Sequence, residues 1–145
     1  MSISVRLATI SDVGAILAVD TGAPPDQART AKAGRWISAD HCHVAEAGGM
    51  VVGYGVRTET FFGSAFVEVL MVDPNHRRQA VGTTMLRYFF ASCPTPKLWT
   101  STNLSNLPMQ RLLAREGFIL SGVIDNIDPG DPELFYLKRR GQPAL

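Results

Sequence analysis

Two adjacent arginines, Arg77 and Arg78, follow a short apolar stretch and precede an amphipathic pattern. Residues 67–72 favour a strand, and the spacing of apolar residues over 79–91 predicts a helix. A helix N-terminus presents unpaired backbone N–H groups and about half a positive charge, so it binds phosphate readily. The arginines add charge and bidentate donors, and Gly82 leaves room for a ligand near the backbone. The junction predicts a phosphate site; the alternative is a solvated basic turn with a packing glycine.

Two common phosphate-binding motifs are excluded. A P-loop needs a lysine before its hydroxyl residue, but Thr83 and Thr84 follow Gly82 with no lysine between them. A dinucleotide-binding turn needs G-x-G-x-x-G, which the chain lacks.

The stretch VDPNHRRQAVGTTML, residues 72–86, resembles the acyl-CoA motif of the GCN5-related N-acetyltransferases, the GNAT superfamily. The core of that motif is Gln/Arg-x-x-Gly-x-Gly/Ala, and Arg77 and Gly82 match its ends. Ala80 stands where the pattern has its first glycine. Alanine loses little there if the backbone is helical, but it costs about 1 kcal/mol or more if φ is positive.

A second stretch, NLPMQRLLAREGF at 106–118, resembles the later helix of the same family. Asn106, Leu112, Gly117 and Phe118 match in register, and Met109 replaces an alanine. Leu113 replaces the tyrosine that often protonates the leaving thiolate. The resemblance extends over nearly the whole chain, because the order of predicted elements also matches the family fold.

The resemblance implies where acetyl-CoA binds. The backbone of residues 70–72 would hold the pantetheine arm and thioester, the amides at the basic turn would hold the pyrophosphate, and Asn106 would bond the arm from the other side. The implied contacts are Leu70, Met71, Val72, Arg77, Arg78, Gln79, Ala80, Val81, Gly82, Thr83 and Asn106. Residues 70–72 also suit a plain core strand, and both interpretations hold if only the backbone binds.

The implied reaction is attack of a primary amine on the thioester, which needs a group to take the amine proton. Glu68 is the acid just upstream of residues 70–72, in an otherwise apolar strand, so we expect a partly desolvated carboxylate suited to a general base. The alternatives are an ordered water as base and a glutamate that only pairs with a cation. Leu113 cannot donate a proton, so water would protonate the thiolate.

Composition is that of one ordinary domain. The chain has 145 residues, 46% hydrophobic and 19% charged, with a formal net charge of +1. This charge gives no case for a nucleic-acid or anionic-membrane partner. Two cysteines make no disulfide framework, and we find neither a signal peptide nor a run long enough to span a membrane. We therefore expect one cytoplasmic domain over residues 1–145.

The pattern along the chain predicts a mixed α/β (α+β) fold. Strands are expected at 2–7, 41–47, 50–59, 61–72, 98–102, 118–124 and 133–139, and helices at about 10–20, 28–38, 79–91 and 105–115. A T-x-x-D capping box at 9–12 opens the first helix, and Gly48-Gly49 marks a hairpin turn. We expect a mostly antiparallel, twisted central sheet of six to seven strands with helices on both faces, as in the GNAT acyltransferase fold.

Four other segments carry polar groups. His41 and His43 share a strand face, but two histidines without a third ligand make a poor metal site, so we expect no metal. The acid-rich stretch 125–133 either attracts a cationic amine or is a turn-rich surface loop, which we favour. Residues 101–106 either face the acceptor or cap the next helix. We expect the basic residues 138–140 to form a solvated tail.

We interpret the sequence as an N-acetyltransferase that uses acetyl-CoA. The rival hypothesis is an acyl-CoA-binding regulatory or sensor module without turnover, which the departures at Ala80 and Leu113 favour. The acceptor is a small amine or a protein amine that the sequence does not identify. Dimers are common in the family, so a homodimer is compatible with the resemblance.

Overall fold

The computed structural model describes residues 2–20 and 26–141. Its strands are β1 (Ile3–Leu7), β2 (Cys42–Ala47), β3 (Met50–Phe61), β4 (Ser64–Val72), β5 (Lys97–Asn103), β6 (Ile119–Asp128) and β7 (Asp131–Arg139). Its helices are α1 (Val13–Val19), α2 (Gln27–Ser38), α3 (Val81–Ala91) and α4 (Leu107–Arg115). Short 3-10 turns at Ile10–Asp12 and Pro74–His76 precede α1 and α3.

The strands form one mixed sheet in the order β1-β2-β3-β4-β5-β7-β6. The pairs β1–β2, β2–β3, β5–β7 and β6–β7 are antiparallel, and β4–β5 is parallel. The predicted mixed, mostly antiparallel sheet is therefore confirmed, with seven strands. In the described part of the chain, no helix has the length and apolar character needed to cross a membrane.

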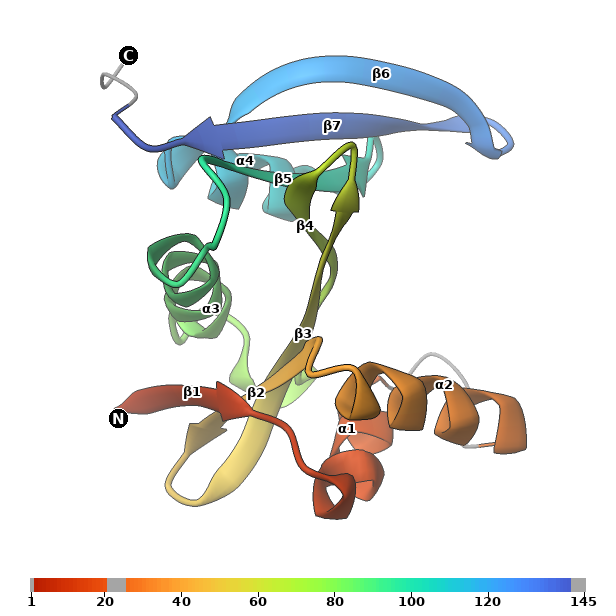
Figure 1. Cartoon of the computed structure of the whole chain (residues 1–145), viewed down its shortest axis with the longest axis vertical. Coiled ribbons are helices and arrows are strands. Elements are labelled where there is room, and N and C mark those ends of the chain that lie inside the picture. The colour runs from red at the N-terminus through yellow and green to blue at the C-terminus, as the bar shows by residue number, and fades with distance from the viewer. Residues whose placement is uncertain (1, 21–25, 142–145) are drawn as a thin grey trace. The chain divides into compact units, whose positions relative to one another are not determined.

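The chain divides into two compact units. The first comprises the described residues up to Arg57 together with Val69–Tyr88. The second comprises Thr58–Glu68 and the described residues from Phe89 onward. Strands β3 and β4 and helix α3 each contribute residues to both units, and Figure 1 shows the elements of each.

In the first unit, helices cover both faces of the strands. Helices α1 and α2 bury Ile16 and Ile37 in a core that includes Val44, Tyr54 and Val56 from β2 and β3. Spacing of buried residues at three and four positions directs one stripe of each helix to this core. The predicted capping box is present, because the backbone N–H of Thr9 donates to Asp12 Oδ2 at 2.7 Å.

Helix α3 lies on the other face of β3, where Gly53 has no side chain. A Cβ at Gly53 would lie 3.0 Å from Val81 Cγ1 and 3.3 Å from Met85 Sδ, both on α3. Val81 and Met85 are buried. Glycine therefore allows α3 to pack closely on β3.

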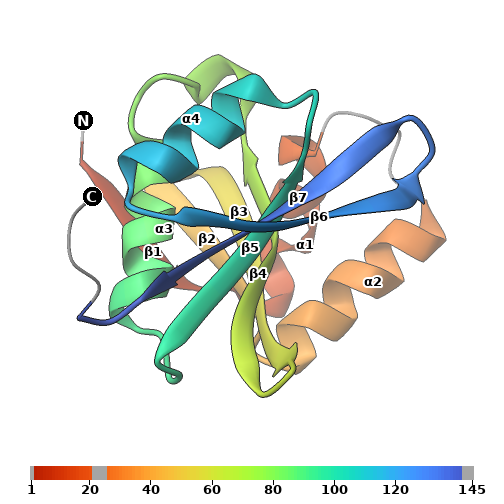
Figure 2. The same ribbon diagram turned by 90° about the horizontal axis from the view of Figure 1, so that it is seen from above.

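In the second unit, alternate residues of β5 face opposite sides. Leu98, Thr100 and Thr102 are buried, while Trp99 and Ser101 face the other side and are half-buried. Thr100 pairs with the buried Tyr136 of β7, so this face carries the core. Helix α4 runs beside β7, as Figures 1 and 2 show.

Several boundaries differ from the predicted ones, and two of them have a clear local cause. Phe61 ends β3, and Phe62-Gly63 forms the two-residue turn, with φ of 51° and 80°. Positive φ is rare for phenylalanine, so Phe62 carries no turn signal. Strand β6 extends through the acid-rich stretch to Asp128, beyond its predicted end at residue 124, and a turn at Pro129-Gly130 follows. Its pairing with β7 is irregular between Ile124 and Asp128, as at a β-bulge.

Candidate active site

The basic turn forms as the sequence predicts. The Asp73 carboxylate accepts a hydrogen bond of 2.8 Å from the backbone N–H of Asn75, which starts the 3-10 turn after β4. Arg77 and Arg78 follow and are exposed. Arg78 and Ala80 have φ of 67° and 64°. Left-handed residues within a turn direct successive N–H groups toward one side, which is typical of anion-binding backbone.

Helix α3 supplies further donors at Val81, the residue where it begins. The backbone N–H of Thr84 bonds the carbonyl of Ala80 at 2.9 Å, which closes the first helical turn. By helix geometry, the N–H groups of Val81, Gly82 and Thr83 have no partner within the helix. The Thr84 hydroxyl also donates to Ala80 O, at 2.7 Å, so Thr83 is the better placed of the two threonines to bind a ligand.

Ala80 resolves the alternative that the sequence left open. Its φ of 64° places it in the left-handed region, where alanine is strained and glycine is not. The departure from the glycine pattern therefore has a conformational cost. Ala80 is also exposed, so its methyl group lies on the surface of the turn.

The strand segment that precedes the turn is positioned by Gly53, which the sequence analysis did not single out. A Cβ at Gly53 would lie 2.9 Å from the carbonyl oxygen of Met71, closer than real Cβ atoms approach. The backbone N–H of Asp73 bonds Val52 O at 2.8 Å. Close approach of β3 thus holds the backbone of β4 here, and glycine inside a strand is the signal that could have indicated it. Met71 is exposed, and Leu70 and Val72 are half-buried.

Glu68 lies in the second unit, next to the segment at residues 69–72. The hydroxyl of Thr58 donates to Glu68 Oε1 at 3.3 Å. The Glu68 side chain is exposed, so the expected partial desolvation is wrong. The reason is the alternation of β4, which buries Ala65 and Val67 and directs Glu68 to the opposite face.

Asn106 begins α4 as its N-terminal cap. Its Oδ1 accepts from the backbone N–H of Met109 at 3.2 Å. The side-chain amide hydrogens are therefore what Asn106 offers to a ligand, and the side chain is exposed. Leu113, at the usual tyrosine position, is wholly buried.

The tyrosines serve elsewhere in their units. Tyr54 is buried, its hydroxyl donates to Asp20 Oδ2 at 3.5 Å, and burial raises the pKa of the phenol. The ring of Tyr88 packs on His43, with centroids 5.2 Å apart. Tyr136 is buried in β7, and burial raises the pKa of its phenol.

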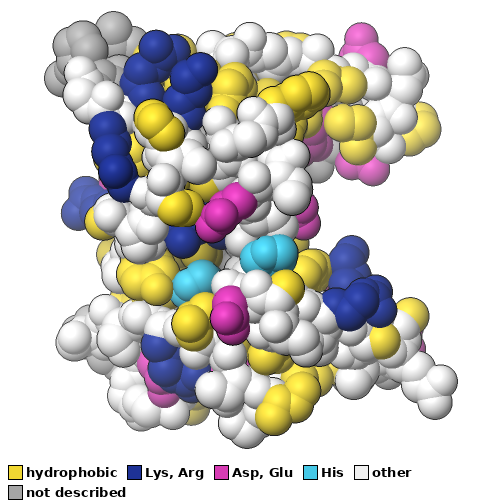
Figure 3. Space-filling model, viewed as in Figure 1, with side chains coloured by type: hydrophobic (Ala, Val, Ile, Leu, Met, Phe, Trp, Pro, Cys, Tyr) yellow, Lys and Arg dark blue, Asp and Glu magenta, His cyan; other side chains and the backbone are white. Residues whose placement is uncertain are grey.

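The acid-rich stretch binds the polar segment that follows β5. Asp131 accepts from the backbone N–H of Ser105 at 3.0 Å and from its hydroxyl at 2.5 Å. Asn103 Nδ2 donates to Asp128 Oδ2 at 3.0 Å. These two acids hold the β6–β7 turn to the loop before α4, which supports the structural interpretation of both segments. Figure 3 shows acidic side chains at this end of the unit and basic side chains at the opposite end.

The last basic residues are not a solvated tail as expected. Lys138 lies on β7 with its ammonium nitrogen 4.3 Å from the centroid of the Phe90 ring, and the Arg140 guanidinium bonds the carbonyl of Cys93. Phe90 and Cys93 are too far away in sequence for the composition of a terminus to reveal these contacts.

Burial lowers the pKa of His43, and no three metal-ligating side chains gather anywhere in the described residues.

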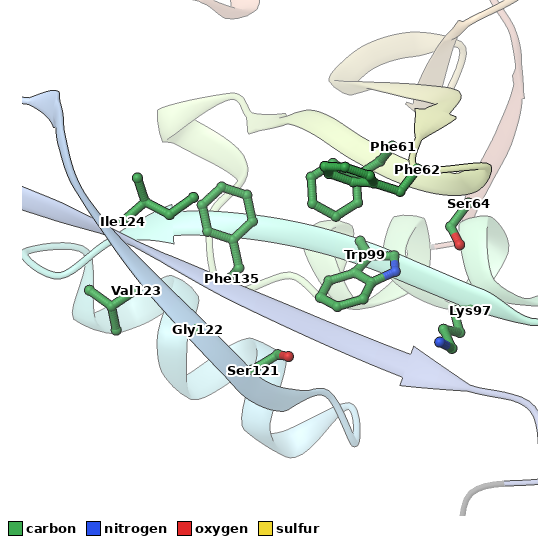
Figure 4. A pocket seen from close by; sticks show the side chains of 10 residues that line it. All are labelled: Phe61, Phe62, Ser64, Lys97, Trp99, Ser121, Gly122, Val123, Ile124 and Phe135. Atoms are coloured by element: carbon green, nitrogen blue, oxygen red, sulfur yellow. The ribbon is translucent and has the colours of Figure 1, made fainter.

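An aromatic pocket of about 460 Å³ on the second unit was not predicted. The rings of Phe61, Phe62, Trp99 and Phe135 line it, with Lys97 at its edge, as Figure 4 shows. Phe61 ends β3 and Phe62 lies in the turn after it, while Trp99 and Phe135 lie on β5 and β7. The registers Phe66–Trp99 and Ser101–Phe135 place them on one face.

A protein-family model matches most of this chain. Residues 14–118 match the family model described as Acetyltransferase (GNAT) family. The chain belongs to the GNAT acetyltransferase family. The matched residues include the basic turn, Glu68, Asn106 and Leu113, and they come from both units.

Solved acetyltransferase structures share the fold. A GNAT-family acetyltransferase from Bacillus cereus ATCC 10987 is 28% identical, with a TM-score of 0.90, and the match covers 98% of this chain and 100% of that one. A ribosomal-protein-alanine N-acetyltransferase from Brucella melitensis is 21% identical (TM-score 0.78, covering 94% and 99%). The ribosomal-protein-S18-alanine N-acetyltransferase from Escherichia coli is 14% identical (TM-score 0.77, covering 98% and 96%). A search of curated proteins found no match.

Proposed function

We propose that this GNAT protein transfers the acetyl group of acetyl-CoA to a primary amine, and that the whole chain acts as one catalytic domain. The observation that carries the proposal is the junction of β4 and α3. An exposed pair of arginines, two left-handed residues and the first N–H groups of an eleven-residue helix follow one another there. This arrangement suits a pyrophosphate, because charge and backbone donors converge on one anion.

The remaining contacts to the donor follow from the family. The backbone of Leu70, Met71 and Val72 would hold the pantetheine arm and the thioester, and the Asn106 amide would donate to the arm. The side chains of Gln79 and Ala80 are exposed, so their backbone groups are accessible to the pyrophosphate. Val81 is buried, so only its N–H group would contribute.

The reaction is direct attack of the amine nitrogen on the thioester carbonyl. The new C–N bond forms as the C–S bond breaks, CoA leaves as its thiolate, and the second proton of the attacking nitrogen passes through water to that thiolate. An alkylamine has a pKa of about 10.4, so one proton must leave before attack at neutral pH. Glu68 would accept that proton, directly or through water, while Thr58 holds one of its carboxylate oxygens.

Leu113 requires that another group protonate the thiolate. A thiol has a pKa of about 8.5, so the thiolate is a fair leaving group and can take its proton from water. Orienting the two reactants supplies roughly 7–11 kcal/mol of a barrier in favourable cases. Catalysis by positioning therefore suits a site with leucine at this place.

The experiment measures thiol release from acetyl-CoA in the presence of a panel of primary amines, with mass spectrometry of the products and calorimetric titration of CoA. We expect CoA binding and an N-acetylated product with at least one amine. CoA binding without thiol release above the amine-free control would instead support the regulatory module. The ribosomal-protein acetyltransferases resemble this chain in fold alone, so peptides with N-terminal alanine enter the panel as one class among several.

A further inference from the structure

The aromatic pocket of the second unit has a preformed floor. The centroid of the Phe61 ring lies 4.8 Å from that of Phe66, 5.3 Å from Trp99 and 6.0 Å from Phe135. The Phe61 and Phe135 rings are almost parallel, with 14° between their planes. These distances are those of favourable aromatic pairs, so the rings support one another without a ligand. A flat apolar group would meet π-faces on several sides.

The volume and the edge of the pocket indicate the size and charge of its ligand. About 460 Å³ is within the range of small-molecule sites. The hydroxyls of Ser64 and Ser121 and the indole N–H of Trp99 are the neutral polar side-chain groups of its lining, and Lys97 is the one charged side chain among the described residues that line it. A second positive charge on a ligand would therefore be disfavoured in this pocket.

Glu68 lies two residues along β4 from Phe66, whose ring belongs to the floor of the pocket. Ser64, Phe66 and Glu68 alternate with the buried Ala65 and Val67, so the first three share one face of β4. Two residues along a strand span roughly 7 Å, so the backbone of Glu68 lies about that far from the backbone of Phe66, whose ring packs on Phe61. An amine at Glu68 would thus be joined by a short chain to a group resting on Phe66 and Trp99.

We infer that the acceptor is a primary amine with one positive charge, carried on a flat apolar body such as the phenyl ring of an arylalkylamine. The amine lies at Glu68 and the ring lies in the aromatic pocket. This inference rests on the proposed acetyl transfer and names its acceptor class. Polyamines are poor acceptors, because their further charges would lie near the Lys97 ammonium, which repels them.

The pocket can be filled without disturbing the fold. Gly122 lines it opposite Phe135 in the β6–β7 register, and a Cβ at Gly122 would meet no atom within 4 Å. Gly122→Leu therefore places a side chain beside the Phe135 ring. Gly14→Leu is the matched control, since Gly14 on α1 is equally open and lies outside the pocket. Phe62→Ala is a second variant that cannot unfold the core, because Phe62 is 94% exposed.

Acetyl transfer is measured with 2-phenylethylamine, n-propylamine and spermidine. We expect kcat/KM for 2-phenylethylamine to exceed that for the other two by about ten- to a hundredfold, the factor that corresponds to burial of one aromatic ring. Gly122→Leu should remove this advantage and leave the n-propylamine rate and CoA affinity unchanged. Phe62→Ala should reduce the advantage in part, and Gly14→Leu should preserve it. Equal use of all three amines, or an equal loss for all in Gly122→Leu, would overturn the inference.

A binding measurement separates this inference from the proposed reaction. The chain has two tryptophans, so Trp36→Phe leaves Trp99 as the only indole reporter. We expect 2-phenylethylamine to change the Trp99 fluorescence, and Gly122→Leu to abolish the change. If no amine is acetylated, the proposed reaction fails, and this titration still decides the pocket. Unchanged fluorescence would overturn the pocket as an amine site.

Discussion

Thr58 Oγ1 lies 3.3 Å from Glu68 Oε1 and donates a hydrogen bond to it across two neighbouring strands. The bond fixes one carboxylate oxygen and leaves the other to face an amine. Thr58 is buried and Glu68 is exposed, so the carboxylate is held at its base while it remains open to solvent. The pair therefore suits a base that must accept a proton from a ligand.

Glu68→Gln tests this role. Glutamine keeps the shape and a hydrogen-bonding group but takes no proton at neutral pH, so we expect turnover to fall about 10²–10⁴-fold with CoA affinity unchanged. The loss should shrink at high pH, where the amine deprotonates without help. Rate against pH and a melting curve are measured for each protein, with Glu59→Gln, another exposed glutamate of the second unit, as the control. An unchanged pH–rate profile would leave water as the base.

Arg78→Ala tests the anion site. A charge-assisted hydrogen bond is worth roughly 1.5–3 kcal/mol, so loss of the guanidinium should weaken CoA binding about ten- to a hundredfold. Gly82→Asp should weaken it further, because a carboxylate there would repel the pyrophosphate. Calorimetric titration measures both, with the exposed Arg35 of α2 replaced by alanine as the control. Equal affinity in all three variants would show that the turn is only a solvated loop.

The sequence predicted elements well where local periodicity determines them. The helix after the basic turn begins at Val81 instead of residue 79, because Ala80 takes a left-handed conformation. Local sequence could not reveal this, since alanine ordinarily favours the helix. The turn at Phe62 was missed because a positive φ is likewise unusual for phenylalanine.

The aromatic pocket was missed for a different reason. Phe61, Trp99 and Phe135 lie on three strands, and only the register of the sheet brings their rings together. Gly53 did carry a signal, since glycine inside a strand indicates close approach of another backbone. The exposure of Glu68 follows from strand alternation, because its face of β4 is opposite to the one that buries Ala65 and Val67.

Leu113→Ala separates packing from chemistry. Leu113 is wholly buried, so its truncation should lower the free energy of unfolding by about 2–5 kcal/mol. Turnover per folded molecule and CoA affinity should remain, because the side chain cannot donate a proton. Denaturant unfolding and initial rates are compared with Leu107→Ala, an exposed leucine of the same helix. A large loss of turnover at unchanged stability would contradict this account.

The ion pair of Asp12 with Arg6 makes stability depend on acid pH. Hydrogen bonds from Arg6, 2.8 Å and 3.0 Å long, lower the pKa of Asp12 from 3.8 to about 2. A carboxyl group with a lowered pKa stabilises the fold at pH values above its ordinary pKa, and this contribution is lost as the pH falls from about 4 to 2. Because the Arg6 side chain is 42% exposed, solvent screens the ion pair, and we expect it to contribute about 1–2 kcal/mol to the free energy of unfolding.

Urea unfolding of the parent and of Asp12→Asn measures this contribution. The stability difference between them should be full at pH 6 and should shrink as pH falls below 4. Asp125→Asn, at an exposed position on β6, should show no such narrowing. If the stability difference between the parent and Asp12→Asn stayed constant down to pH 2.5, the effect of Asp12 would come from its capping bond with the Thr9 backbone instead of its charge.

Ala80→Gly should stabilise the protein, although alanine-to-glycine changes usually do the opposite. At a φ of 64°, alanine carries a left-handed cost of about 1–2 kcal/mol that glycine avoids. Glycine also adds freedom to the unfolded chain, which offsets about 0.4–1 kcal/mol. We therefore expect a net gain of roughly 0.5 kcal/mol. Ala114→Gly, at an exposed position within α4, should instead lose about 1 kcal/mol. Thermal and denaturant unfolding measure both variants, and a loss in Ala80→Gly equal to that in Ala114→Gly would show that Ala80 is helical in solution. Because the turn keeps its shape, CoA affinity should stay equal or rise, which a titration of Ala80→Gly checks independently of stability.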